Sequence, residues 1–257
     1  MAAKPKVAFF EFTSCEGCQL TVVDSLQTHP ELLDVIEIVR FREAMSEKGD
    51  DYLIAFIEGS CSRPSDEPVI KEIRQRAQLV VALGACAHLG GINTIRNRFP
   101  LDDVRRYVYG DKAEWYETYP ARPIEAVIPV DAVLPGCPID REEMVRAVKA
   151  LLQGRAPQIP DYPVCVECKL KENVCVYQRK KTCLGPIARA GCDAICPTYG
   201  DGCEGCRGLI PNPNIDSLKE VLSEHGLSLE ETTAKMTLFL TYQTMEREAV
   251  GDGKGNG

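Results

Sequence analysis

Thirteen cysteines are the residues of this 257-residue sequence that are best suited to chemistry. Their number is odd, and the opening "MAAKPK" leads to acidic Glu11 rather than to the apolar core of a signal peptide, so we expect reduced thiols rather than disulfides. Reduced thiolates at close spacing form redox pairs or bind zinc or iron–sulfur clusters. The positions of the cysteines decide among these chemistries.

Five cysteines follow apolar runs in the first half of the chain. Cys15 and Cys18 come after "KVAFFEFT", Cys61 after "YLIAFIEGS", Cys86 at the end of "LVVALGAC" and Cys137 at the end of "AVLPGC". The carboxyl ends of parallel strands share one edge of an open sheet, and such folds bind their ligands there. We therefore expect five sulfurs to converge on one edge.

Three kinds of site are compatible with these sulfurs. A thioredoxin-like redox pair would use the first two cysteines and leave the later ones without a role. Structural zinc usually takes two close pairs, whereas here single cysteines from distant strands join one pair. A [4Fe-4S] cluster takes four thiolates from different directions, and Gly17, Gly84 and Gly136 would let backbone N–H groups approach it. The pattern favours a cluster over zinc.

Eight further cysteines lie between residues 165 and 206, among Gly, Pro and charged residues with little apolar periodicity. Pro197, directly after Cys196, is typical of ferredoxin-type ligation. A zinc ribbon remains an alternative for either group of four cysteines taken alone. Such a segment cannot build an ordinary apolar core, so we expect metal binding to hold it together. The first set is Cys165, Cys168, Cys175 and Cys183, and the second is Cys192, Cys196, Cys203 and Cys206.

The apolar patterns predict alternating strands and helices around the first five cysteines. This alternation predicts an α/β fold over residues 1–154, with a flavodoxin-like, mostly parallel sheet between helices. Strands are expected at 6–13, 32–41, 52–59, 78–86 and 131–137, and helices at 19–26, 66–77 and 141–154.

Residues 155–250 are expected to form a small irregular iron–sulfur domain with C-terminal helices, and residues 251–257 a disordered tail. The last helix opens with the capping-box pattern of Ser228 and Glu231. Its periodicity places four apolar residues inward, Leu229, Met236, Phe239 and Leu240.

Composition excludes two classes of partner. The net charge of −8 and the lack of a basic, aromatic-rich face exclude a nucleic-acid surface. No apolar run approaches the roughly 18 residues that a membrane span needs, and no twin-arginine signal precedes the first strand. The sequence therefore predicts a cytoplasmic protein.

The chain resembles the small, electron-transferring subunit of [NiFe] hydrogenases, in the cytoplasmic group whose partners handle NAD(P), ferredoxin or F420. The resemblance rests on "SCEGCQ", "FIEGS", "LGACAHLGGI" and "LPGCPID", and on "CVEC", "KTCLGPIARAGC" and "CPTYGDGCEGCRG", which together span most of residues 7–208. It implies three [4Fe-4S] clusters, a separate large subunit that holds the nickel–iron centre, and an NAD(P)- or ferredoxin-linked flavoprotein or iron–sulfur partner.

The resemblance also implies which cysteines bind each cluster. Periplasmic members have a histidine in place of Cys165 and a proline in place of Cys196, and the latter gives them a three-iron medial cluster. Here full thiolate ligation implies four irons in every cluster. The implied proximal ligands are Cys15, Cys18, Cys86 and Cys137, the medial ligands Cys192, Cys196, Cys203 and Cys206, and the distal ligands Cys165, Cys168, Cys175 and Cys183.

Three residues near the first site keep open roles. Cys61 is either a fifth sulfur able to alter the proximal cluster or a small buried residue, and the second interpretation is favoured. Glu16 and Glu58 are expected at the same edge, where a carboxylate relays protons or tunes potential, or serves as a hydrogen-bonded structural group. The alternatives for the whole chain are a complex-I-like iron–sulfur subunit and a zinc-stapled adaptor without redox function.

Overall fold

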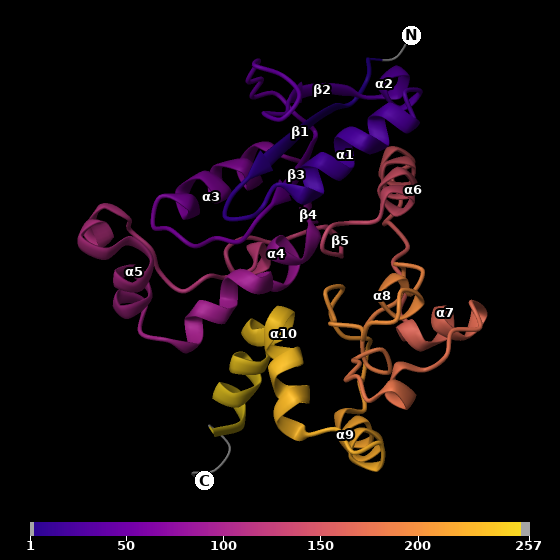
Figure 1. Ribbon diagram of the computed structural model, residues 1–257. Helices are drawn as coiled ribbons and strands as arrows, with labels where there is room; N and C mark the ends of the chain where they lie inside the picture. The colour runs from indigo at the N-terminus through magenta and orange to yellow at the C-terminus, as the bar shows by residue number, and fades with distance from the viewer. Residues whose placement is uncertain (1–2, 253–257) are drawn as a thin grey trace. The chain divides into compact units, whose positions relative to one another are not determined.

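The computed structural model describes residues 3–252 (Figure 1), and the chain divides into two compact units, Met1–Gln158 and Ile159–Gly257. The first unit contains the sheet and five cysteines, and the second contains the other eight. Within the described residues, no helix combines the length and apolar character that crossing a membrane requires.

The first unit is built on a five-stranded parallel sheet in the order β2-β1-β3-β4-β5. This order is that of flavodoxin-like folds, so the predicted fold class is confirmed. Strands β3 and β4 are almost wholly buried and apolar, as parallel strands covered on both faces must be. The strands are β1 (Lys6–Glu11), β2 (Glu37–Arg40), β3 (Ile54–Glu58), β4 (Leu79–Leu83) and β5 (Ala132–Leu134).

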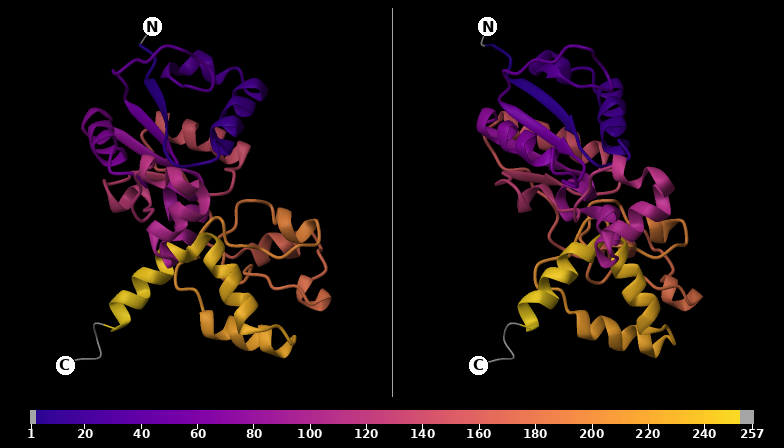
Figure 2. Two further views of the ribbon diagram at one scale, coloured as in Figure 1. Left: turned by 60° about the vertical axis from the view of Figure 1, so that its left-hand side comes forward. Right: turned by 90° about the vertical axis from the view of Figure 1, so that its left-hand side faces the viewer.

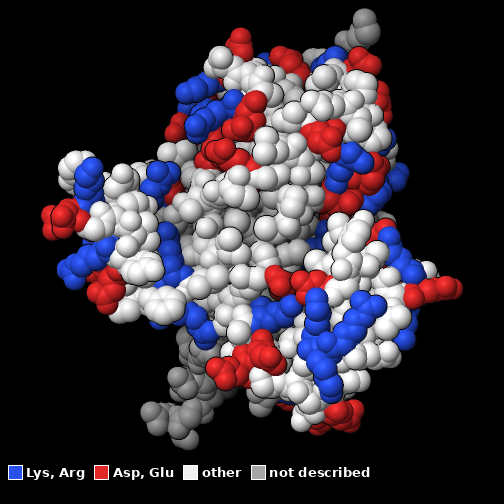
Figure 3. Space-filling view, in the orientation of Figure 1, with Lys and Arg blue, Asp and Glu red and all other residues white. Residues whose placement is uncertain are grey.

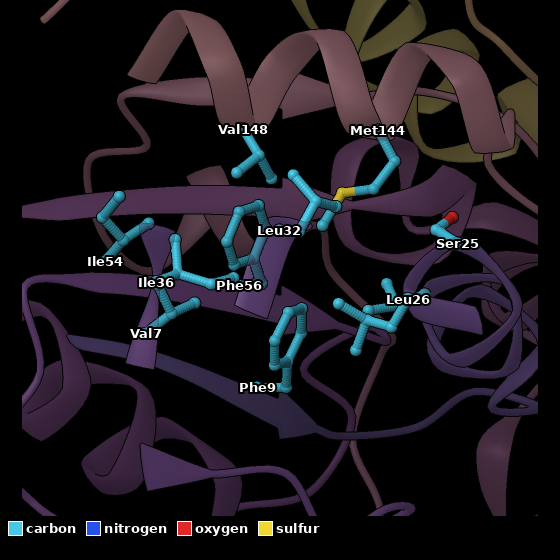
Figure 4. Close-up of a pocket in the computed structure, with 11 residues that line it drawn as sticks. Val7, Phe9, Ser25, Leu26, Leu32, Ile36, Ile54, Phe56, Met144 and Val148 are labelled. Carbon is cyan, nitrogen blue, oxygen red and sulfur yellow. The ribbon is translucent and has the colours of Figure 1, made fainter. Parts of the chain in front are cut away.

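Helices cover both faces of this sheet (Figure 2). On one face, Phe9 stacks on Phe56 with ring centroids 5.0 Å apart, beneath α1 (Gly17–Thr28) and α6 (Arg141–Leu152). The small pocket on this side is lined almost entirely by apolar side chains of the sheet and these helices (Figure 4). Since it lacks converging polar groups, we assign it to core packing and not to ligand binding.

The opposite face packs against α3 (Asp66–Arg76), whose Ile70 and Ile73 are buried in a core that includes Ala55 and Ile57 of β3. The connection from β4 to β5 contains α4 (Gly84–Leu89), η1 (Gly91–Arg98), α5 (Leu101–Tyr109), η2 (Gly110–Trp115) and η3 (Ile124–Ala126).

All five predicted strands extend beyond the observed ones, and in two cases part of the predicted strand is helical. Residues Leu32–Val35 form the short helix α2, and only Glu37–Arg40 forms a strand. This is an edge strand, and a shift of register between Val7 and Ala8 limits its pairing with β1. The strand predicted to reach Cys86 ends at Leu83, because Gly84 adopts a φ of +83° and begins α4.

The second unit consists of loops and short helices, followed by two longer ones. Ser228 and Glu231 form the predicted reciprocal capping box, with the Glu231 backbone N–H donating to Ser228 Oγ at 3.1 Å and the Ser228 N–H donating to Glu231 Oε2 at 3.2 Å. Phe239 and Leu240 are buried as predicted, Met236 is only partly buried, and the side chain of Leu229 lies outside the described residues. The helices are α7 (Val164–Leu170), η4 (Val176–Arg179), α8 (Ile195–Thr198), α9 (Ile215–Glu224) and α10 (Leu229–Asp252).

The end of the chain differs in part from the predicted disordered tail. Helix α10 continues to Asp252, so the first two residues of that segment are helical. The remainder of the predicted tail, 253–257, lies outside the described residues.

Candidate metal centres

Three chain segments meet at the carboxyl edge of the sheet in the first unit. Cys15 and Cys18 flank the start of α1, Cys86 lies in the first turn of α4, and Cys137 follows β5. The backbone N–H of Ala85 donates to the carbonyl oxygen of Gly136 at 2.7 Å, which joins the segment of Cys86 to that of Cys137.

Gly84 is the point at which these segments come closest. A Cβ atom placed on Gly84 would lie 2.3 Å from Cys18 Sγ and 3.4 Å from the carbonyl oxygen of Gly136. Real Cβ atoms are not found so close to another atom, and the positive φ of Gly84 also disfavours a side chain. Only glycine therefore lets the α4 segment approach the Cys18 sulfur.

The four thiols share one partly buried space. Burial, together with the nearby Cys137 and Cys15, raises the pKa of Cys86 to about 12. Burial also raises the pKa of Cys18 far above its usual range, with contributions from Glu58, Cys137 and Cys86. Such thiols resist ionisation until a cation neutralises them, and metal coordination deprotonates thiols outright.

Glu58 caps the helix that carries Cys18. Its carboxylate accepts hydrogen bonds from the backbone N–H groups of Cys18 at 3.2 Å and Gln19 at 3.1 Å, which helix α1 otherwise leaves without intrahelical partners. Glu58 is the last residue of β3, and it is 2% exposed. Burial raises the pKa of Glu58, while these backbone hydrogen bonds counteract the rise.

Glu16 occupies the N-cap position of α1 but makes no capping hydrogen bond through its side chain. Its backbone adopts a left-handed conformation with φ of 63°, and its N–H donates to Ser14 Oγ at 3.4 Å. The half-buried Glu16 carboxylate contributes to the raised pKa of Glu58. The two predicted carboxylates thus lie near each other, and Glu58 alone holds the helix terminus.

Cys61 has different neighbours from the other four cysteines of this unit. It is 0% exposed, its sulfur lies 2.6 Å from the Tyr119 hydroxyl, and its backbone pairs with that of Arg122. Burial raises the pKa of Cys61, and the other groups that act on it are Tyr119, Arg122 and Asp66. The structure therefore brings together four of the five sulfurs that were expected to converge, and places Cys61 in the apolar core beside α3.

The first set of the second unit gathers around Gly185. A Cβ atom on Gly185 would lie 3.3 Å from Cys165 Sγ and 3.3 Å from Cys183 Sγ. Burial raises the pKa of Cys165 to about 12, with contributions from Cys183, Cys168 and Cys175. Cys165 therefore lies near the other three thiols of this set.

The second set lies beside the first. Burial raises the pKa of Cys203 well above its usual range, and Cys183, Cys206 and Cys192 contribute to the rise. The fourth member, Cys196, has its pKa raised first by burial and then by Cys192. The backbone N–H of Cys203 donates to Cys183 Sγ at 3.1 Å, so one hydrogen bond joins the two sets directly.

Glu167 also connects the two sets, a role that the spacing of the cysteines did not predict. It lies between Cys165 and Cys168 on α7, and its carboxylate accepts hydrogen bonds from the N–H groups of Gly191 at 2.7 Å and Ala194 at 3.0 Å. These two residues flank Cys192. The signal in the sequence was a Glu inside each Cys-x-x-Cys motif, which marks Glu16, Glu167 and Glu204.

All thirteen cysteines lie in the described part of the chain and are free thiols. Among the residues that the structure describes, no three Cys, His, Asp or Glu side chains converge tightly enough to hold a single metal ion. A [4Fe-4S] cluster has another geometry, because its thiolates surround an inorganic core from different sides. Three sets of four free thiols, two of them with a glycine at the closest approach, are compatible with such a core.

Comparison with known proteins extends over both units. Residues 15–151 match the family model described as "NADH ubiquinone oxidoreductase, 20 Kd subunit". Sulfhydrogenase 2 subunit delta of Pyrococcus furiosus is 36% identical over 236 residues, which cover 91% of this chain and 98% of that protein. A subunit of the F420-non-reducing hydrogenase vhu of Methanococcus voltae is 33% identical, with 91% of this chain and 89% of that protein covered.

A solved structure gives a third similarity. The crystal structure of an NAD+-reducing [NiFe]-hydrogenase in its H2-reduced state contains a chain with a TM-score of 0.56 and 26% sequence identity. The match covers 62% of the present chain and 96% of that chain.

Proposed function

Because this chain belongs to the family of [NiFe] hydrogenase small subunits, we propose that it conducts electrons through three [4Fe-4S] clusters. Its role in the hydrogenase is electron transfer. The clusters would connect the nickel–iron site of a large subunit with a second electron-transfer module. When bound, each cluster supplies a site that takes up and releases one electron.

One observation supports the proposal, namely that four thiols gather at the edge of the sheet in the first unit and eight more gather in the second unit, where the sequence spacing divides them into two sets of four. The matched relatives span both units, including the eight cysteines of the second unit, whereas the family model ends at residue 151. A complex-I-like subunit needs the first unit alone, so the second unit favours a hydrogenase. The proposed ligand sets are Cys15, Cys18, Cys86 and Cys137 (proximal), Cys192, Cys196, Cys203 and Cys206 (medial), and Cys165, Cys168, Cys175 and Cys183 (distal).

The surface around the proximal set supports an interface with a large subunit. In Figure 3 the area over α4, which carries Cys86, shows no Lys, Arg, Asp or Glu side chains on the visible face. Nearby in the sequence, Leu20 and Ile92 are exposed, and so are Cys15 and Cys137. Apolar residues and exposed thiols at one edge are suited to burial in a heteromeric interface.

The second module is proposed from the names of the relatives. The matched solved structure is of an NAD+-reducing enzyme, and the matched relatives come from a sulfhydrogenase and from an F420-non-reducing hydrogenase. We infer a cytoplasmic complex with an NAD(P)- or ferredoxin-linked flavoprotein or iron–sulfur partner.

Anaerobic purification of the complex tests the proposal through metal and sulfide analysis. We expect about twelve irons and an equal amount of acid-labile sulfide for each copy of this chain, with nickel confined to the large subunit. Electron paramagnetic resonance (EPR) of the reduced complex should show interacting [4Fe-4S] signals. A colourless chain that contains zinc and no sulfide would instead identify a zinc-stapled adaptor, and a single cluster would identify a complex-I-like subunit.

A further inference from the structure

Helix α10 of the second unit packs against the loop that contains Cys203 and Cys206. Gly205 of this loop has a φ of +74°, and a Cβ atom there would lie 3.5 Å from Leu240 Cδ1 of α10. Leu240 is fully buried, and Phe239 beside it is nearly so. The helix therefore packs directly on the loop that carries two cysteines of the medial set.

The same helix brings one positive charge to this loop. Lys235 precedes Phe239 by one helical turn, and its side chain is 16% exposed. Its Nζ lies 3.4 Å from Oε1 of Glu204, which stands between Cys203 and Cys206. A lysine that is largely removed from water is an uncommon feature on a surface helix and retains most of its electrostatic effect.

Lys235 lies beside the place where the two cysteine sets of the second unit meet. Its partner Glu204 directly follows Cys203 of the medial set, and the backbone N–H of Cys203 donates to Cys183 Sγ of the distal set at 3.1 Å. One ammonium group thus lies near segments that carry ligands of both sets.

We propose, on the basis of the function inferred above, that Lys235 is a positioning charge that raises the reduction potentials of the medial and distal clusters. Reduction adds an electron to a cluster, and a nearby positive charge stabilises the added electron. Glu204 opposes this effect, and its ion pair holds the lysine beside the medial set. The pair therefore sets how readily these two clusters accept electrons.

A redox titration of the intact complex, followed by EPR, tests this role. In Lys235→Met the two potentials of the second unit should fall, by an amount equal to a roughly threefold to tenfold change in the reduction equilibrium, where tenfold is about 59 mV for one electron. Lys235→Arg keeps the charge and should keep the potentials. Glu204→Gln keeps an amide oxygen that accepts a hydrogen bond from Lys235 but removes the opposing charge, so it should raise them.

Lys219→Met provides the matched control, because Lys219 lies on α9 and pairs with Asp216 at 3.2 Å. It should leave all three potentials unchanged. If Lys235→Met keeps its iron but its reduction potentials do not fall, the proposed role of Lys235 is refuted. If Lys235→Met loses iron, unchanged potentials in Glu204→Gln refute it instead. A wild-type complex without iron–sulfur clusters would refute the proposed function itself, which distinguishes the two failures.

Discussion

The carboxylate of Glu58 at the end of β3 accepts hydrogen bonds from the backbone N–H groups of Cys18 and Gln19 at the start of α1. One buried side chain thus connects the central strand to the helix that carries a proposed cluster ligand. An anion at this position also compensates the positive end of the helix dipole.

Replacement of Glu58 by Gln should weaken this connection. The amide keeps one acceptor but loses the charge, which should cost about 1 kcal/mol, as for the loss of a helix cap. The anaerobic complex should then melt roughly 2–4 °C lower at unchanged iron content. Glu72→Gln is the control, since Glu72 makes an exposed ion pair with Arg76 within α3. An equal melting temperature for wild type and Glu58→Gln would contradict the capping role, and a loss of hydrogen turnover at full iron content would support a proton relay.

Gly84→Ala should remove the proximal cluster selectively. The new methyl group would occupy space that Cys18 Sγ needs, so we expect iron to fall by about a third while the clusters of the second unit remain. Gly154→Ala is a matched control, because Gly154 also has a positive φ (68°) but no atom within 4 Å of the new Cβ. Similar iron loss in both variants would show that backbone strain, and not the sulfur contact, is responsible.

Cys61→Ala should destabilise the first unit without changing any cluster. The variant removes a buried sulfur and the partner of the Tyr119 hydroxyl, which together should cost about 1–3 kcal/mol. Thermal unfolding of the complex measures this loss, and the EPR spectrum and potential of the proximal cluster should match those of the wild type. Tyr119→Phe should reproduce part of the loss, since it breaks the same contact from the other side. A changed proximal potential would restore Cys61 as a fifth sulfur that acts on the cluster.

Glu167→Gln should loosen the segment around Cys192. The amide cannot accept at both oxygen positions from Gly191 and Ala194, so one backbone N–H loses its partner. Hydrogen exchange at residues 190–195 should accelerate several-fold, and the EPR signal of the medial cluster should broaden. Glu220→Gln on the exposed side of α9 serves as control. Exchange at the wild-type rate in Glu167→Gln would show that the two hydrogen bonds are not required.

The sequence predicted the fold class because the apolar runs of the parallel strands and the facing helices have clear periodicities. It also predicted that the segments of Cys15, Cys18, Cys86 and Cys137 meet, since the ends of parallel strands fall on one edge of a sheet. The two sets of the second unit followed from spacing in a segment too polar to form a core. These features depend on local order along the chain.

The partners of individual side chains required the tertiary structure. Cys61 and Cys86 look alike in the sequence, each near the end of an apolar strand, yet Gly84 turns the chain so that Cys86 joins the other thiols while Cys61 contacts Tyr119. Likewise, nothing local joins Lys235 to Glu204, 31 residues earlier. Such contacts depend on a glycine's positive φ and on how a distant helix packs, and neither is encoded in the spacing of the residues they affect.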